Sequence, residues 1–128
     1  MADSTGFSGY VKIARPATSK NTANPHEIVR YAVINAAGSG DNTLVAAVVS
    51  KKIRVLSLFY LASGTVTVRF ESGAGGTALT GQMQHIAQTG AVLPFNEDGW
   101  FETAAGALLN LELNSAVSVN GSLSYIEV

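Results

Sequence analysis

The hexapeptide NEDGWF, residues 96–101, gathers the side chains that could do chemistry: an amide, two carboxylates, the only tryptophan and a phenylalanine. The oxygens of Asn96, Glu97 and Asp98 could bind Ca²⁺, which takes roughly six to eight oxygen ligands. The ring of Trp100 beside these acids could stack on a sugar. The two carboxylates could also act as a general acid and base.

The spacing within the hexapeptide favours a turn over a site. On a strand the adjacent Glu97 and Asp98 side chains would point to opposite faces, so adjacency alone does not make an acid/base pair. The loop also lacks the alternating aspartates of a calcium loop. We interpret residues 94–99 as a turn in which the glycine takes a positive φ. We hypothesise that Trp100 and Phe101 then pack in the core or between subunits; if Trp100 is fully buried, Trp100→Ala costs about 3–5 kcal/mol.

The rest of the chain holds few candidates for catalysis. His26 and His85 are far apart and stand in no metal-binding motif. There is no cysteine and no G-x-S-x-G serine. The glycine-rich stretches around residues 38–42 and 71–81 lack the G-K-[ST] ending of a phosphate-binding loop. The sequence therefore predicts no catalytic, cofactor-binding or metal-binding residue, and we expect the protein not to be an enzyme.

The composition limits the partners. The 128 residues suit one domain, and charged residues are 13%, about half of the usual share of roughly 25%. A net charge of −1 gives no electrostatic footprint for nucleic acid. No apolar stretch approaches the roughly 18 residues of a membrane span, and the first residues do not resemble a signal peptide. We expect a protein that is made in the cytoplasm and whose low-charge surface is covered partly by neighbouring copies.

The strands must position whatever the chain binds. Residues 1–27 carry two of the three prolines and few large apolar groups, which predicts an extended N-terminal arm. From residue 28 onward, short apolar runs alternate with turn formers, and Thr65–Glu71 alternates strictly between apolar and polar residues. The predicted strands are 28–34, 43–49, 53–62, 65–71, 83–86, 91–93, 107–113 and a last one within 116–128.

Two connections have specific predictions. Ser63-Gly64, between the strands 53–62 and 65–71, reads as a tight hairpin turn. Asn120-Gly121 could be a type I′ hairpin turn, but the alternation keeps its phase across the glycine, which favours one long final strand with a bulge. About eight antiparallel strands without helices predict an all-β sandwich or jelly roll over residues 28–128.

Four segments together resemble a known family. They are KKIRVLS (51–57), VTVRFESG with GGTALTG (66–81), GWFETAAGALLNLEL (99–113) and GSLSYIEV (121–128). In this order they resemble the small single jelly-roll structural proteins of tailed bacteriophages, found as head decoration or cement proteins and as tail or fibre modules. The resemblance runs from Asn42 to the end of the chain.

The resemblance implies a capsid decoration (cement) protein that binds the outside of the head shell and stabilises contacts between capsomers. Its partners would be the major capsid protein and itself, as a homodimer or homotrimer, and it would be located on the virion exterior. No cofactor would be needed. The alternative is a receptor- or carbohydrate-binding jelly-roll module of a tail or fibre. For the arm we hypothesise a set of capsid contacts: Phe7, Tyr10, Val11, Ile13 and Arg15.

Overall fold

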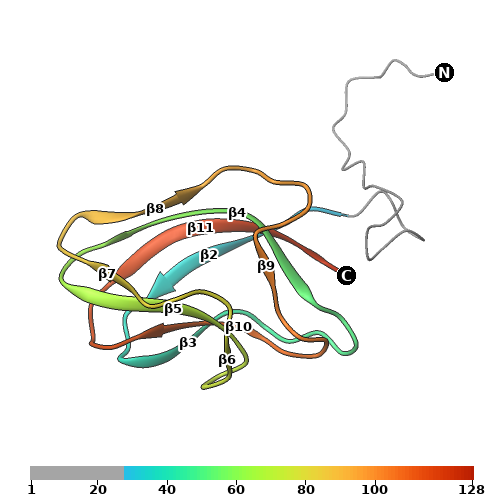
Figure 1. The fold of residues 1–128 in the computed structure, drawn as a ribbon, viewed down its shortest axis with the longest axis horizontal. Helices are drawn as coiled ribbons and strands as arrows, with labels where there is room; N and C mark the ends of the chain where they lie inside the picture. Colours follow the sequence, from blue (N-terminus) through green and yellow to red (C-terminus); the bar gives the residue numbers. More distant parts are fainter. Residues whose placement is uncertain (1–27) are drawn as a thin grey trace, which may run out of the picture.

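The computed structural model describes residues 28–128, which form two antiparallel β-sheets (Figure 1). The strands in this part are β2 (Arg30–Ala36), β3 (Gly40–Val45), β4 (Ile53–Ala62), β5 (Val66–Ser72), β6 (Thr77–Ala78), β7 (Met83–His85), β8 (Thr89–Leu93), β9 (Phe101–Glu102), β10 (Leu109–Leu113) and β11 (Val119–Glu127). The all-β prediction is confirmed for residues 28–128, where no helix is long and apolar enough to cross a membrane.

Each sheet has five strands. Sheet 1 has the order β2-β11-β4-β8, and β9 also pairs with β4. Sheet 2 has the order β3-β10-β5, and both β6 and β7 pair with β5. Figure 1 shows β8, β4, β11 and β2 side by side in one layer, with β5, β10 and β3 in the other. The result is a sandwich of ten strands in the described part, two of which are only two residues long.

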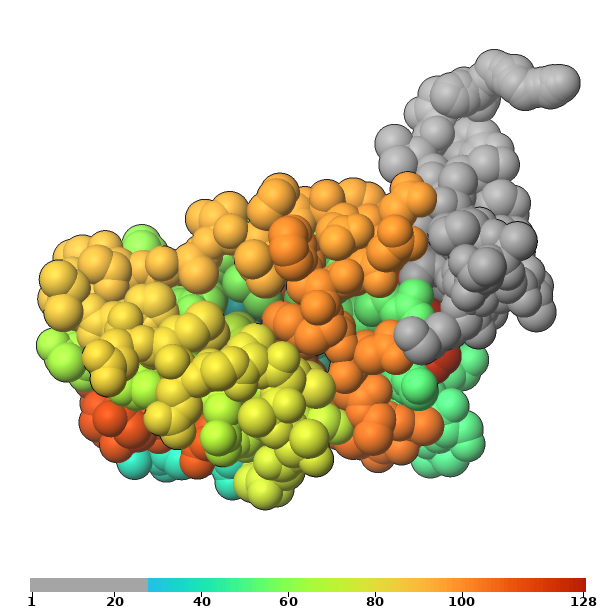
Figure 2. All heavy atoms as spheres, in the orientation of Figure 1, coloured from blue at the N-terminus to red at the C-terminus, as the bar shows by residue number. Residues whose placement is uncertain are grey.

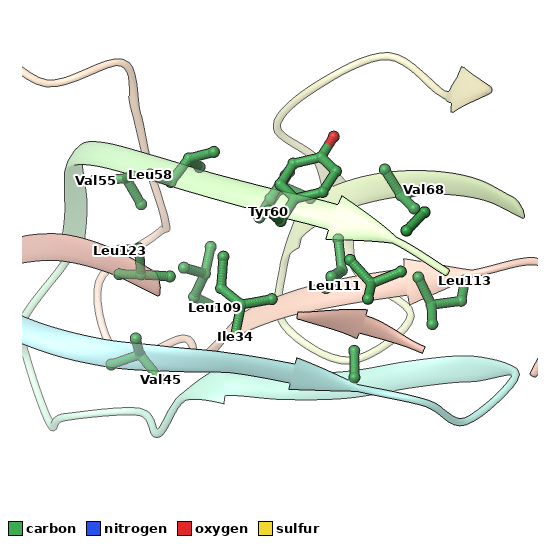
Figure 3. Close-up of a cluster of buried hydrophobic side chains, with 14 of the residues drawn as sticks. Ile34, Val45, Val55, Leu58, Tyr60, Val68, Leu109, Leu111, Leu113 and Leu123 are labelled. Atoms are coloured by element: carbon green, nitrogen blue, oxygen red, sulfur yellow. The ribbon is translucent and has the colours of Figure 1, made fainter. Parts of the chain in front are cut away.

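The core lies between the sheets and follows the predicted alternation. On β10, Leu109, Leu111 and Leu113 are buried, and on β5, Val66, Val68 and Phe70 are buried. They meet Ile34 of β2 and the inward side chains of β4 and β11 (Figure 3). Burying these apolar side chains removes them from water, which supplies the main driving force for folding. The core thus joins residues that are up to about ninety positions apart in the chain.

The structure corrects the predicted hairpin at Ser63-Gly64. β4 and β5 follow each other in the chain, but they belong to different sheets and do not pair. Ser63-Gly64 therefore carries the chain from one layer to the other, and the amide of Ser63 donates to the carbonyl of Ser118 at 2.9 Å. A short Ser-Gly connection can serve either a hairpin or a crossing between sheets, and the sequence does not distinguish them.

The final strand is confirmed as one element. β11 runs through Asn120-Gly121 without a turn and pairs with β2 on one side and β4 on the other. A Cβ on Gly121 would collide with the carbonyl of Phe59, so glycine lets the two strands approach. The pairing irregularity lies between Ser124 and Tyr125, and its extra residue is on β4 and not on the final strand, where the sequence predicted a bulge.

This irregularity is a bulge on β4. Ser124 pairs with Ser57 and Tyr125 with Val55, so Leu56 is the extra residue on β4. Leu56 and Ile126 are fully buried on the outward side of sheet 1, where Val29 and Val128 pack against them. The bulge therefore marks a covered end of the outward side of sheet 1.

Candidate functional site

The NEDGWF turn follows the edge of β4 past the bulge. β8 pairs with β4 from Leu58 onward, whereas β9 pairs with Arg54 and Val55, so the turn connects two strands on one edge. The amide of Asn96 donates to the carbonyl of Leu56 at 2.9 Å, and the amide of Trp100 donates to that of Val55 at 2.8 Å. These bonds satisfy carbonyls that the interrupted pairing would leave open. The hexapeptide thus completes an edge of sheet 1.

Hydrogen bonds within the turn explain its polar residues. The side-chain oxygen of Asn96 accepts from the amide of Asp98 at 3.0 Å, as in an Asx turn. The amide of Gly99 donates to the carbonyl of Asn96 at 2.9 Å. Gly99 has φ of 83°, which confirms the predicted positive φ, and a Cβ there would collide with the side chain of Arg54. Asn96 and Gly99 are therefore turn residues.

Trp100 and Phe101 lie in different environments. Trp100 is 43% exposed, and its Nε1 donates to the carbonyl of Pro94 at 2.8 Å. Phe101 is partly buried, packs against the core, and has its ring centroid 5.3 Å from that of Phe70. Because Trp100 is not fully buried, the condition for a loss of about 3–5 kcal/mol in Trp100→Ala is not met. In Figure 2 the orange spheres of this part of the chain run from the upper to the lower rim of the face in view.

A shallow hollow of about 260 Å³ lies beside Trp100. Arg54 is buried beneath Gly99, and its Nε donates to Glu102 Oε1 at 2.8 Å. Lys52 Nζ lies 3.5 Å from the other oxygen of Glu102. The hollow is lined by charged groups and aromatic rings: Arg54, Asp98, Gly99, Trp100, Phe101 and Glu102.

His85 connects the two sheets. Its Nε2 lies 3.0 Å from the hydroxyl of Tyr60, and the two rings meet edge to face at 5.3 Å. Burial raises the pKa of Tyr60 to about 12, so this hydroxyl keeps its proton. Because Tyr60 is on β4 and His85 on β7, the contact joins sheet 1 to sheet 2.

Metal-binding groups and the residues of the N-terminal arm remain to be placed. Residues 28–128 contain no group of three or more His, Asp or Glu side chains that could hold a metal ion. The hypothesised capsid contacts lie outside the described residues: Phe7, Tyr10, Val11, Ile13 and Arg15. His26 also lies outside this part.

The outward side of sheet 2 carries a polar network that the sequence reading missed. Glu71 is fully buried, and its carboxylate accepts from Arg69 Nε at 2.9 Å and from Asn110 Nδ2 at 2.9 Å. Arg69 Nη2 also donates to Glu112 at 3.0 Å, and Asn110 Nδ2 donates to Asp41 at 2.8 Å. The signal was present for four of these residues, which occupy the polar positions of alternating predicted strands: Arg69, Glu71, Asn110 and Glu112. The burial of Glu71 was not visible in that pattern.

The network shifts the pKa values of its two glutamates in opposite directions. Burial alone would raise the pKa of Glu71, but hydrogen bonds with Arg69, Glu112 and Asn110 outweigh it and lower that pKa. The hydrogen bond with Glu71, burial and the negative charge of Glu71 raise the pKa of Glu112. Since each carboxylate is bonded within the network, we interpret the cluster as a structural element of sheet 2.

The outward side of sheet 1 is very different beyond the bulge. Large apolar side chains are strongly exposed there: Tyr31 at 77%, Val33 at 71%, Phe59 at 54%, Leu61 at 56% and Val92 at 74%. Their register places them in one continuous area, because Ser122 lies opposite both Val33 and Phe59, and Phe59 lies opposite Val92. We call this area the open face and define it by eight outward positions: Tyr31, Val33, Asn35, Phe59, Leu61, Val92, Asn120 and Ser122.

The sequence showed the apolar residues of the open face but did not show that they are exposed. Residues 53–62 are apolar on both sides, a pattern that is typical of a central or doubly covered strand. β4 is indeed central in sheet 1, but Phe59 and Leu61 remain exposed. An apolar residue on the outward side of a strand does not say what covers it.

No protein-family model matches the chain, and no curated protein matches it.

Proposed function

We propose that this protein is a jelly-roll structural component of a tailed-bacteriophage particle, namely a head decoration (cement) protein. It binds the outside of the shell and stabilises contacts between capsomers. Its partners are the major capsid protein and further copies of itself, as a homodimer or homotrimer.

The observation that carries this proposal is the nested pairing of the strands. The first described strand, β2, pairs with the last, β11; β3 pairs with β10, β4 with β8, and β5 with β7. A chain that wraps in this order makes a jelly roll, with β2-β11-β4-β8 in one sheet and β3-β10-β5-β7 in the other. Jelly rolls are typical of viral capsid and lectin domains.

Two further features support the proposal. The segments that resemble the phage family overlap β4, β5, β10 and β11. These are the inner strands of the two sheets. The open face offers apolar, uncharged surface of the kind that marks protein–protein contact sites. In a decoration protein, copies that contact one another attach to the shell at several points, and multiplicity turns modest contacts into stable attachment.

The test is a count of copies in purified particles of the phage that encodes the chain, by quantitative mass spectrometry and a density map of the head. A decoration protein is present in hundreds of copies at symmetry-related sites outside the shell. A dozen copies or fewer at the tail would replace the proposal with the tail alternative. Absence from the particle would overturn both.

The arm hypothesis has its own readout in the same system. Full-length chain carrying Phe7→Asp and Tyr10→Asp should lose binding to undecorated shells, as measured by co-sedimentation. The matched control is Thr43→Asp, which places the same charge at an exposed position of β3. Undiminished binding of the arm variant would contradict a role of these residues in attachment.

One observation favours the second candidate, a carbohydrate-binding module. Trp100 is 43% exposed beside the hollow, and its indole is held by the carbonyl of Pro94. A fixed exposed ring next to acidic groups can stack on a sugar. A glycan array with parent protein, Trp100→Ala and Trp100→Phe tests it: binding lost in the alanine variant and kept in the phenylalanine variant supports this candidate. No glycan binding by the parent removes it.

A further inference from the structure

We infer that the open face is the contact surface between two copies of this chain. The inference concerns a surface of the described fold and goes beyond the proposed function, since it holds for a head, tail or other location. It rests on the area, the charge and the shape of the open face.

The exposed area is large for a single chain. Five large apolar side chains, each more than half exposed, lie next to one another on the open face. Together they present on the order of 500 Å² of apolar surface, near the upper end of the largest patch on a typical monomer. The polar positions between them bring the face toward the roughly 800 Å² per partner that a standard protein–protein interface buries.

The charge pattern favours an identical partner over a charged one. None of the eight positions of the open face is Asp, Glu, Lys, Arg or His. A partner with charges on its contact surface would bury them here without compensation, which costs free energy. When the face meets a second copy of itself, no charge is buried and no like charges meet.

The relief of the face is complementary to itself. Tyr31 and Val33 make a ridge on β2, and Phe59 and Leu61 make a second ridge on β4. Between them, β11 presents smaller polar side chains, with Ser122 opposite Val33 and Phe59 and Asn120 opposite Leu61. In a two-fold contact, the ridge on β4 of each copy packs into the groove above β11 of the other copy. The same set of contacts therefore forms twice in the dimer.

The width of the face favours a copy over the upstream segment of the same chain. The face covers four neighbouring strands, β2, β11, β4 and β8, which span about 15 Å at the usual strand spacing. A single extended segment would cover only part of this width. Two sheets packed face to face cover it completely, as in the interior of a sandwich.

Thiol labelling of the full-length chain tests the contact, because the chain has no cysteine of its own. Val33→Cys places a thiol on the open face, where the side chain is 71% exposed. Thr43→Cys is the matched control on an exposed position of β3 in sheet 2. Between about 1 μM and about 1 mM protein, labelling of Val33→Cys should slow about tenfold as copies associate, whereas labelling of Thr43→Cys should not change.

Every outcome of the labelling decides the inference. Fast labelling of Val33→Cys at all concentrations means that no copy covers the face and overturns it. Slow labelling at all concentrations supports the inference if sedimentation velocity shows a dimer throughout; in a monomer it means that another part of the same chain covers the face and overturns the inference. Concentration-dependent protection of both positions would place the contact elsewhere and overturn it as well.

A second measurement guards against a local effect of the cysteine. Phe59→Glu should convert the associated species to monomer at concentrations where the parent is associated, as measured by sedimentation velocity, whereas Thr43→Glu should not. Circular dichroism of both variants must match the parent. A dimer or larger assembly that survives in folded Phe59→Glu contradicts the inference.

Discussion

The outward sides of the two sheets differ in how they meet their surroundings. On sheet 2, Arg69 bonds to Glu71 and Glu112 on the outward side, and Asn110 donates to both Glu71 and Asp41. On sheet 1 the open face holds no charged residue, and its large apolar side chains are more than half exposed. An antiparallel sheet that faces water usually carries polar residues on that side. Sheet 2 follows this rule and sheet 1 does not.

A second contrast lies within sheet 1 itself. At the bulged end, the apolar side chains of Leu56 and Ile126 are fully buried, because Val29 and Val128 pack against them. Arg54 at the same end lies under Gly99. The open face continues the same side of the sheet, yet the described residues do not cover it. Within residues 28–128, the apolar outward side is therefore covered at the bulged end and uncovered on the open face, which is the surface inferred above to contact a second copy.

The largest effect is expected where the charges of sheet 2 are buried. Glu71→Ala should lower the free energy of unfolding by about 3 kcal/mol, because it removes the buried carboxylate that accepts from both Arg69 and Asn110. Urea denaturation at pH 7 measures it. Glu112→Ala is the control: its side chain is 37% exposed, and the change should stay below about 1 kcal/mol. Equal losses in both variants would mean that burial does not distinguish the two carboxylates.

The pH dependence gives a smaller effect of known sign. The pKa of Glu71 is lowered in the fold from its ordinary 4.5, so its charged form stabilises the folded state above about pH 4.5. This contribution is lost as the pH falls through the lowered pKa. The pKa of Glu112 is raised, so its protonation favours folding as the pH falls and opposes part of the loss.

The parent and Glu71→Gln should therefore differ by about 2 kcal/mol at pH 7 and converge as the pH falls below 4.5 through the lowered pKa of Glu71. Urea denaturation at several pH values measures the difference, and Glu112→Gln serves as the control that removes the opposing contribution. A difference that stays constant over the whole acid range in which the parent still folds would show that the size and shape of the Glu71 side chain matter, and not its charge.

The sequence predicted the strands better than it predicted which strands pair with one another. β4 has the predicted bounds of Ile53–Ala62, and the alternation of Val66, Val68 and Phe70 gave the buried side of β5 correctly. Strand periodicity is local, so it can be read from a single segment. β3 begins at Gly40 and not at Thr43, because Gly40 to Asn42 pair with β10, which is some seventy residues away in the chain.

The connections and the candidate site depended on contacts that no local pattern contains. Ser63-Gly64 crosses between sheets because β4 pairs with β8 and β11 instead of β5. Trp100 stays on the surface because its indole bonds to the carbonyl of Pro94, whereas the next ring turns inward to Phe70. The open face is recognisable only when β2, β11, β4 and β8 lie side by side.

The smallest effect is expected on the open face, and it tests the comparison most directly. Val33→Thr should change the free energy of unfolding by less than about 0.5 kcal/mol at concentrations where the chain is monomeric, since Val33 is already 71% exposed and threonine also suits a strand. Val68→Thr, the same substitution at a fully buried position of β5, should cost about 2 kcal/mol because it places a hydroxyl in the core. Chemical denaturation of both variants at about 1 μM measures the pair. If the two losses were equal, Val33 would be covered in the isolated chain, and the contrast between the two sheets would be one of composition and not of exposure.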